Sequence, residues 1–307
     1  MHLPLLLSLA LGAASLQVHA ATGRFVEPES LPSEALGTNR TVRIWLPPSY
    51  DAAADRRFPV LYLHDGQNVL SSAGPHVAFG WGNWEVDKSV ERLAAEGRMR
   101  EIILVAIDNT RQRFPEYRGP SAGGEDSVYQ AYRRFLIEEL KPMIDRRYRT
   151  LPDAANTGVM GSSLGGIVSL ALAWDRPDVF GLAASVSGAF QVEQKHFLGH
   201  VLKTHRDGPK PFRIYLDSGI SSGRGDDGRT NTLAVANELR RIGWVDGVNL
   251  KHHLDEVPLT AEQLAPFNLP PDKLKEAQTA QHNELYWRLR VWRPLEFLFP
   301  PQKSATP

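Results

Sequence analysis

Residues 159–167 have the sequence Val-Met-Gly-Ser-Ser-Leu-Gly-Gly-Ile, in which Gly161-x-Ser163-x-Gly165 lies between an expected strand and an expected helix. A serine hydroxyl is a weak nucleophile and must stand clear of a sheet to meet both its base and a substrate carbonyl. A sharp strand–turn–helix elbow achieves this, and glycines two residues to either side relieve the crowding of the backbone. The main-chain N–H of Leu164 would then point at a developing oxyanion. The same spacing is also compatible with a glycine-rich turn around a buried serine.

The rest of the chain predicts alternating strands and helices. Apolar runs predict strands at 40–46, 58–64, 102–107, 156–160, 182–186 and 212–216, with a weaker candidate at 250–254. Apolar residues at helical spacing predict helices at 84–95, 129–148, 167–174, 232–242 and 285–298. Pro142 must kink or split the second of these helices. The alternation requires crossover connections, so we expect one α/β domain with a mostly parallel central sheet and helices on both faces.

The composition excludes several classes of protein. Of the 307 residues 42% are hydrophobic, and 35 basic residues balance 35 acidic ones. This balance argues against a nucleic-acid-binding protein, which needs a basic surplus on one face, and the apolar content argues against a disordered chain. The absence of cysteine excludes thiolate metal sites, a cysteine nucleophile and disulfides.

The first 20 residues have the features of a signal peptide. An apolar run at 4–14 is too short to span a bilayer comfortably, and it is followed by Val18-His19-Ala20, with small residues at the cleavage positions. We therefore expect a mature domain at 21–307, located in the periplasm or secreted, without a membrane span after cleavage. The alternative is an uncleaved anchor or a buried helix.

The base is expected after the serine, because triads on this architecture run serine, acid, histidine along the chain. His252 and His253 lie inside an expected strand, where their side chains face opposite sides of the sheet, as in ordinary strand residues. His282 lies in a loop directly before an amphipathic helix, past the last strand. His282 is therefore the predicted general base.

The acid should follow the strand at 212–216, where it would orient the imidazole. We favour Asp227 in the loop 218–228, with the neighbouring Asp226 as the alternative acid. Asp217 ends the strand itself and is also suited to hydrogen-bonding the loop backbone.

A second oxyanion donor should come from the loop that follows the strand at 58–64. This loop begins His64-Asp65-Gly66-Gln67-Asn68, and Gly66 would allow its backbone to approach a reacting carbonyl. The main-chain N–H of Gln67 is the predicted donor. His64 and Asp65 either brace the loop or contact the substrate.

Together these residues resemble the putative esterase family of α/β-hydrolases, which includes esterase D-like carboxylesterases, feruloyl and acetylxylan esterases, enterochelin esterase-like enzymes and mycolyltransferases. The matching segments are 42–50, 59–68, 84–87, 107–109 with Glu116-Tyr117, 161–166, and His282-Asn283-Glu284 with Trp287. The Asp-Gly-Gln-Asn and His-Asn-Glu signatures are more specific than the serine elbow alone. The resemblance implies an α/β-hydrolase fold.

For the site, the resemblance implies Ser163 as nucleophile, His282 as base, and the N–H groups of Gln67 and Leu164 as oxyanion hole. Extra residues separate Gly219 from the two candidate aspartates, so the resemblance does not choose between them. An insertion at about 257–280 is longer than the usual link to the histidine, and it forms either a lid or a surface excursion.

We therefore expect an exported serine esterase that hydrolyses carboxylic esters through an acyl-enzyme, without metal or organic cofactor. The expected substrate is a small-molecule, carbohydrate or siderophore-type ester. The alternatives are transfer of the acyl group to a sugar or lipid hydroxyl, and a noncatalytic carbohydrate-binding module. Arginines after the strand at 102–107 either favour an anionic substrate or form a solvated face: Arg111, Arg113 and Arg118. Six aromatic residues either line a pocket or belong to the core: Tyr62, Trp81, Trp84, Tyr117, Trp287 and Trp292.

Overall fold

A mixed sheet forms the centre of the molecule. The computed structural model describes residues 22–121, 126–220, 226–265, 269–278 and 281–302, so the expected signal peptide lies outside the described residues. Within these ranges the strand order is β1-β2-β4-β3-β5-β6-β7-β8. The strands are β1 (Arg24–Ser33), β2 (Thr38–Leu46), β3 (Val60–His64), β4 (Ile103–Ile107), β5 (Thr157–Ser162), β6 (Leu182–Val186), β7 (Arg213–Ser218) and β8 (Leu250–Leu254). β1 and β2 are antiparallel to their neighbours, and the other pairs are parallel.

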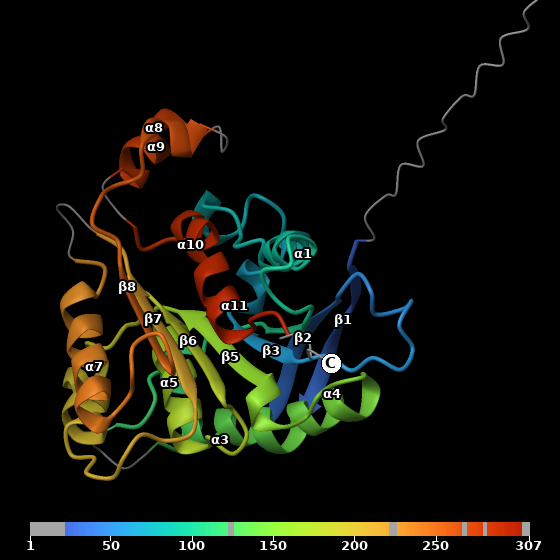
Figure 1. Ribbon diagram of the computed structural model, residues 1–307, viewed down its shortest axis with the longest axis horizontal. Helices are drawn as coiled ribbons and strands as arrows, with labels where there is room; N and C mark the ends of the chain where they lie inside the picture. The colour runs from blue at the N-terminus through green and yellow to red at the C-terminus, as the bar shows by residue number, and fades with distance from the viewer. Residues whose placement is uncertain (1–21, 122–125, 221–225, 266–268, 279–280, 303–307) are drawn as a thin grey trace, which may run out of the picture.

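Helices cover both faces of the sheet (Figure 1), which confirms the predicted layers. One face packs against α3 (Ser127–Arg134), a π-helical segment at Phe135–Leu140, α4 (Lys141–Arg147), α5 (Leu164–Asp175) and α7 (Arg229–Ile242). The other face packs against α1 (Val86–Ala95), α10 (Glu284–Arg290) and α11 (Trp292–Leu298). Short helical turns complete the connections: Gly66–Asn68, Ser71–Ala73, Ala78–Gly80, α2 (Arg113–Tyr117), Ala154–Asn156, α6 (Val192–His196) and Phe197–Leu202.

Three elements differ from the sequence-based expectation. β1 was not predicted, because this edge strand is largely exposed and has no apolar pattern. The helix expected at 129–148 is divided: a π-helical segment, Phe135–Leu140, separates α3 from α4, and Pro142 lies in the first turn of α4. The helix expected at 285–298 is two helices, α10 and α11, that meet at Val291.

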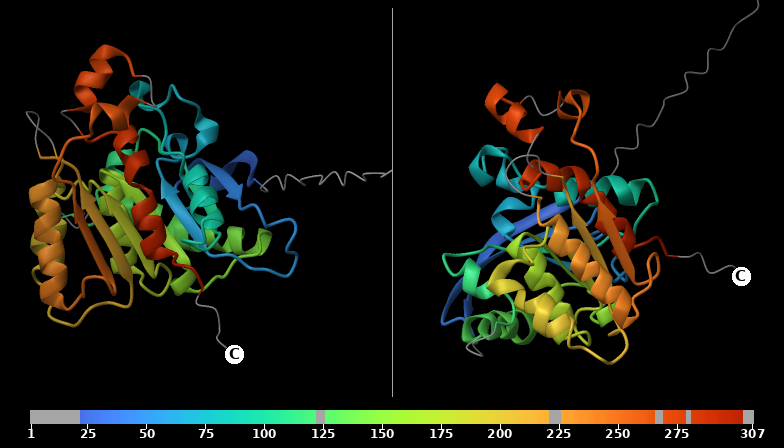
Figure 2. Two further views of the ribbon diagram at one scale, coloured as in Figure 1. Left: turned by 45° about the horizontal axis from the view of Figure 1, so that its top comes forward. Right: turned by 90° about the vertical axis from the view of Figure 1, so that its left-hand side faces the viewer.

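The described parts of the insertion, residues 257–265 and 269–278, lie beyond the carboxyl edge of the sheet, next to α10 (Figures 1 and 2). It contains α8 (Ala261–Leu264), which starts at a capping box of Thr260 and Gln263, and α9 (Pro271–Ala277). Leu264 and Ala277 form a small apolar cluster with Leu285 and Tyr286 of α10. The insertion is therefore packed onto the helix that follows His282. None of the helices in the described ranges is long and apolar enough to cross a membrane.

Candidate active site

Ser163 occupies a strained turn between β5 and α5. Its backbone has φ 55° and ψ −120°, a region that L-residues rarely adopt. The turn is held by its N–H, which donates to the carbonyl of Val186 at 3.0 Å, and by its carbonyl, which accepts from Ala189 at 2.9 Å. A Cβ on Gly161 would lie 2.8 Å from the backbone of Gly165, and one on Gly165 would lie 3.2 Å from the Cβ of His64. The turn thus requires glycine at 161, and a side chain at 165 would crowd His64.

A cavity of about 620 Å³ opens beside this turn at the carboxyl edge of the sheet. Its lining combines Ser163 with His282, residues of the loop after β3, four aromatic side chains and several polar groups. The members that matter here are Asp65, Gln67, Asn68, Phe79, Trp81, Trp84, Asn109, Arg113, Ser163, His282, Glu284 and Trp287. The structure therefore brings three sequence-predicted residues, Gln67, Ser163 and His282, to one cavity.

Asp227, and not Asp226, contacts His282. The Nδ1 atom of His282 lies 2.6 Å from Oδ1 of Asp227, whose side chain is fully buried. The imidazole is 44% exposed and lies edge-on to the ring of Trp287 at 5.1 Å. Asp226 instead accepts a hydrogen bond from the N–H of Thr230 in the first turn of α7, and the Thr230 hydroxyl lowers its pKa.

A buried hydroxyl holds the other oxygen of Asp227. Oγ of Ser187 donates to Oδ2 of Asp227 at 2.7 Å, and the N–H of Gly219 donates to the same oxygen at 2.5 Å. Oγ of Ser187 also lies 3.0 Å from Nε1 of Trp287 and 2.8 Å from a terminal nitrogen of Arg290, both of which can only donate. Because both lone pairs of Oγ are used, its proton must point at Asp227.

Arg290 is buried among three carboxylates. Its guanidinium nitrogens lie 3.6 Å from Asp217, 3.9 Å from Asp227 and 3.3 Å from Asp255. Burial disfavours the charge of Arg290, but the three acids outweigh it and raise its pKa. Burial raises the pKa of Asp217. Its carboxyl group accepts hydrogen bonds from the N–H of Ser187 and from the hydroxyl of Tyr215, so it binds the backbone next to its own strand.

Sequence reasoning missed both Ser187 and Arg290. The available signal was Arg290, a basic residue on the buried face of a helix that also buries Leu285, Tyr286 and Trp287. Nothing in the sequence around Ser187 indicates its contacts, since its partners lie 30 to 103 residues away.

The loop after β3 turns sharply toward Ser163. Asp65 has φ 59°, and a Cβ on Gly66 would lie 2.7 Å from the backbone of Ala106 and Ile107, so glycine is required there. Gln67 lies in the short helical turn that follows, and Leu164 is the first residue of α5. The first N–H groups of a helix have no acceptor within it, so both positions can offer donors.

His64 and Asp65 brace this loop. The carboxylate of Asp65 forms two hydrogen bonds of 2.7 Å with Arg113 and one of 2.5 Å with Asn109. Nδ1 of the buried His64 lies 2.8 Å from the hydroxyl of Tyr132. Burial lowers the pKa of His64 to about 3, so its ring is neutral.

Glu284 is the second carboxyl group of the cavity. It is half-buried at the first turn of α10, and its Oε1 lies 3.4 Å from Nδ2 of Asn68. Burial raises its pKa to about 7. Asp65 contributes to the same increase, because its negative charge opposes that of Glu284.

The remaining candidates divide between the active-site cavity, the core and the surface. His253 contacts Asp255, and burial lowers the pKa of His252 to about 4. Arg113 is ion-paired with Asp65 and Arg118 with Glu193, whereas Arg111 is exposed. Of the six aromatic residues, Tyr62, Tyr117 and Trp292 belong to the apolar clusters of the core, and Trp81, Trp84 and Trp287 line the cavity.

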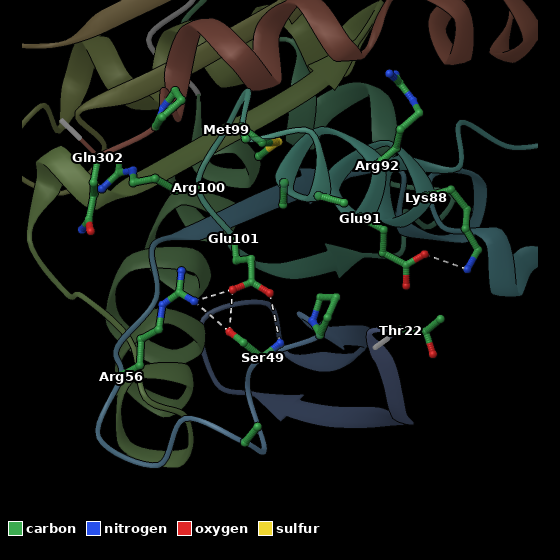
Figure 3. A pocket seen from close by; sticks show the side chains of 16 residues that line it. Thr22, Ser49, Arg56, Lys88, Glu91, Arg92, Met99, Arg100, Glu101 and Gln302 are labelled. Atoms are coloured by element: carbon green, nitrogen blue, oxygen red, sulfur yellow. Dashed lines mark hydrogen bonds and ion pairs between the residues drawn. The ribbon is translucent and has the colours of Figure 1, made fainter. Parts of the chain in front are cut away.

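A larger cavity of about 900 Å³ lies at the opposite, amino edge of the parallel strands (Figure 3). Its lining comes mainly from the loop after β2, from α1 and from the segment between α1 and β4. Two of its acidic groups are paired: Glu101 binds Ser49 and Arg56, and Glu91 binds Lys88. Because Ser163 and His282 lie at the other edge, the smaller cavity is the candidate active site.

Comparisons with known proteins agree with this architecture. The family model described as "Putative esterase" matches residues 33–292. The chain is 24% identical over 280 residues to YbbA of Bacillus subtilis, covering 89% of this chain and 98% of YbbA. It is 23% identical over 256 residues to the ferri-bacillibactin esterase BesA of the same organism, covering 76% and 86%. A solved ferulic acid esterase superposes with a TM-score of 0.64 at 18% identity, covering 91% of this chain and 98% of that one, which shows the α/β-hydrolase fold. The chain belongs to the esterase family that this model describes.

Proposed function

We propose that this protein is an exported serine esterase that hydrolyses carboxylic esters through an acyl-enzyme. Ser163 is the nucleophile, His282 the general base and Asp227 the acid that orients it. The main-chain N–H groups of Gln67 and Leu164 form the oxyanion hole. One observation carries the proposal: the elbow serine and the imidazole held by Asp227 line the same cavity.

The reaction follows from these positions. Oγ of Ser163 attacks the ester carbonyl while Nε2 of His282 takes its proton, and Asp227 stabilises the imidazolium. The carbonyl oxygen becomes an oxyanion, which accepts hydrogen bonds from the two N–H groups. His282 then gives its proton to the leaving alcohol, and Ser163 remains acylated. Water repeats the sequence on the acyl-enzyme and releases the acid.

The proposal includes processing of the chain. Residues 1–20 are removed as a signal peptide, and 21–307 form a single domain with the insertion at 257–280. The intact mass of the protein recovered from the periplasm or medium tests this, since cleavage after Ala20 predicts a chain that starts at Ala21. A full-length mass in the membrane fraction would contradict export by cleavage.

Labelling with a fluorophosphonate tests the chemistry without a choice of substrate. We expect one adduct on Ser163, none in Ser163→Ala, and strongly reduced labelling in His282→Ala. Circular dichroism of each variant checks that the protein is folded. A folded wild-type protein that takes no label would contradict an activated serine and favour a noncatalytic module on this fold.

A further inference from the structure

The two carboxyl groups of the active-site cavity differ in what they bind. Both oxygens of Asp65 are engaged, by the guanidinium of Arg113 and the amide of Asn109. Glu284 forms no ion pair among the described residues, and its one side-chain partner is the amide of Asn68 at 3.4 Å. Glu284 therefore retains unused hydrogen-bonding capacity toward the cavity that it lines.

Glu284 and His282 line the same cavity. Glu284 follows His282 by two residues, and the two groups interact electrostatically. In the proposed function the imidazole must reach the leaving oxygen to protonate it, so groups beside the imidazole flank the alcohol and not the oxyanion. Asn68, which contacts Glu284, belongs to the helical turn after β3 that also contains Gln67.

The lining of the active-site cavity has two acidic side chains, Asp65 and Glu284, and one guanidinium group, that of Arg113. Arg113 is ion-paired with Asp65, so Glu284 is the acidic group of the cavity without an ion pair among the described residues. Burial raises the pKa of Glu284 to about 7, and near that pH the group can both donate and accept hydrogen bonds. Neutral hydroxyl groups also donate and accept hydrogen bonds, so they suit both Glu284 and the amide of Asn68.

A second cavity lies next to the active-site cavity. Trp81 lines both the active-site cavity and this second cavity of about 500 Å³, to which Leu285 and Arg288 of α10 also contribute. The insertion supplies Lys273, whose ammonium lies 4.1 Å from the centre of the Trp81 ring. Phe79, at the rim, is 98% exposed. Aromatic faces beside hydrogen-bonding groups suit a ring with both apolar faces and hydroxyl edges.

We propose that Glu284 and Asn68 form a subsite for free hydroxyl groups of the leaving alcohol, so that the preferred substrate is an ester of a neutral polyol such as a sugar. This inference rests on the proposed function. The same subsite would bind a polyol acceptor if the acyl group were transferred instead of hydrolysed.

A matched pair of esters tests the subsite. Glyceryl monobutyrate and propyl butyrate share the acyl group and a primary three-carbon alcohol, and they differ in two hydroxyls; the corresponding ferulates give a second pair. We expect the wild-type kcat/KM to be higher for the glyceryl ester of a pair. Glu284→Ala should reduce this preference at least about 10-fold, because a hydrogen bond to a charged group is lost. Glu262→Gln, on the exposed surface of α8, should leave both rates unchanged.

The pH dependence of the preference separates recognition from a structural role. An ionised carboxylate binds hydroxyls more strongly than a neutral acid, so the wild-type preference should rise between pH 6 and 8. Glu284→Gln should keep part of the preference but lose its pH dependence, and pH effects on steps that both esters share cancel in the ratio. Equal losses on both esters, or no loss in Glu284→Ala, would overturn the subsite. A wild-type protein that labels at Ser163 but does not prefer glyceryl esters would overturn the substrate class, whereas absence of labelling would overturn the proposed function itself.

Discussion

Replacing Ser187 with alanine should weaken both the fold and the reactivity of Ser163. The hydroxyl donates to Asp227 at 2.7 Å and accepts from Arg290 at 2.8 Å and from Trp287 at 3.0 Å. Alanine removes all three hydrogen bonds, and two of them involve a charged partner. Hydrogen bonds to charged groups contribute about 1.5–3 kcal/mol each, and neutral ones about 1 kcal/mol.

The net effect is smaller than the sum of these values. Arg290 keeps its contacts with Asp217 and Asp255, and the N–H of Gly219 still donates to Asp227. We expect the free energy of unfolding to fall by about 2–4 kcal/mol. The labelling rate at Ser163 should fall about 10- to 100-fold, because the acid itself remains in place. This is less than the roughly 10⁴-fold loss when the acid of a triad is replaced by an amide, which leaves the histidine in the wrong tautomer.

Ser185 provides the matched control. It lies two residues earlier in the chain, and its buried Oγ has no hydrogen-bond partner among the described residues. Ser185→Ala should therefore cost less than about 1 kcal/mol. Urea unfolding measures stability, and the fluorophosphonate labelling rate across pH measures activation of Ser163. If Ser187→Ala matches Ser185→Ala in both assays, the hydroxyl does not hold Asp227 and the reasoning fails.

Two further predictions concern Asp227 and His64. Asp227→Asn should slow labelling of Ser163 by about 10³-fold or more. Asp226→Asn, whose amide oxygen can still accept from Thr230, should stay within about 3-fold of the wild type; the reverse order would reassign the acid. Burial lowers the pKa of His64 from 6.5 to about 3, so the folded state binds fewer protons than the unfolded state between these pH values. Stability should therefore fall with decreasing pH below 6.5, by about 2–3 kcal/mol at pH 4.5 from this residue, and urea unfolding of His64→Gln should show a correspondingly smaller loss.

The sequence predicts the sheet where strands are buried on both faces. β3, β4, β5 and β6 are fully buried, and buried strands require continuous apolar runs. β1 has no such run because most of its residues are exposed, and its position depends on pairing with β2. Tertiary pairing therefore determines this strand, and no local pattern reveals it.

In the candidate site, too, the sequence predicts the residues that lie in local patterns and does not predict those placed by tertiary contacts. Ser163 and His282 are visible because their surroundings, a glycine elbow and a loop before a helix, are local patterns. Asp226 and Asp227 are adjacent and chemically identical, so the sequence does not separate them. The difference arises from the backbone, since Asp227 adopts φ 51° and turns its side chain inward while Asp226 binds the start of α7.

Two guanidinium groups lie among three acidic side chains next to the proposed triad. Three carboxylates lie within 4 Å of this guanidinium, those of Asp217, Asp227 and Asp255, and Arg293 adds a second guanidinium 2.9 Å from the last of them. With every carboxylate ionised, three negative charges face two positive ones, and uncompensated buried charge is costly. An imidazolium 2.6 Å from Asp227 supplies the missing charge. In the proposed mechanism that imidazolium forms as Ser163 attacks, so the network would stabilise the transition state more than the resting enzyme.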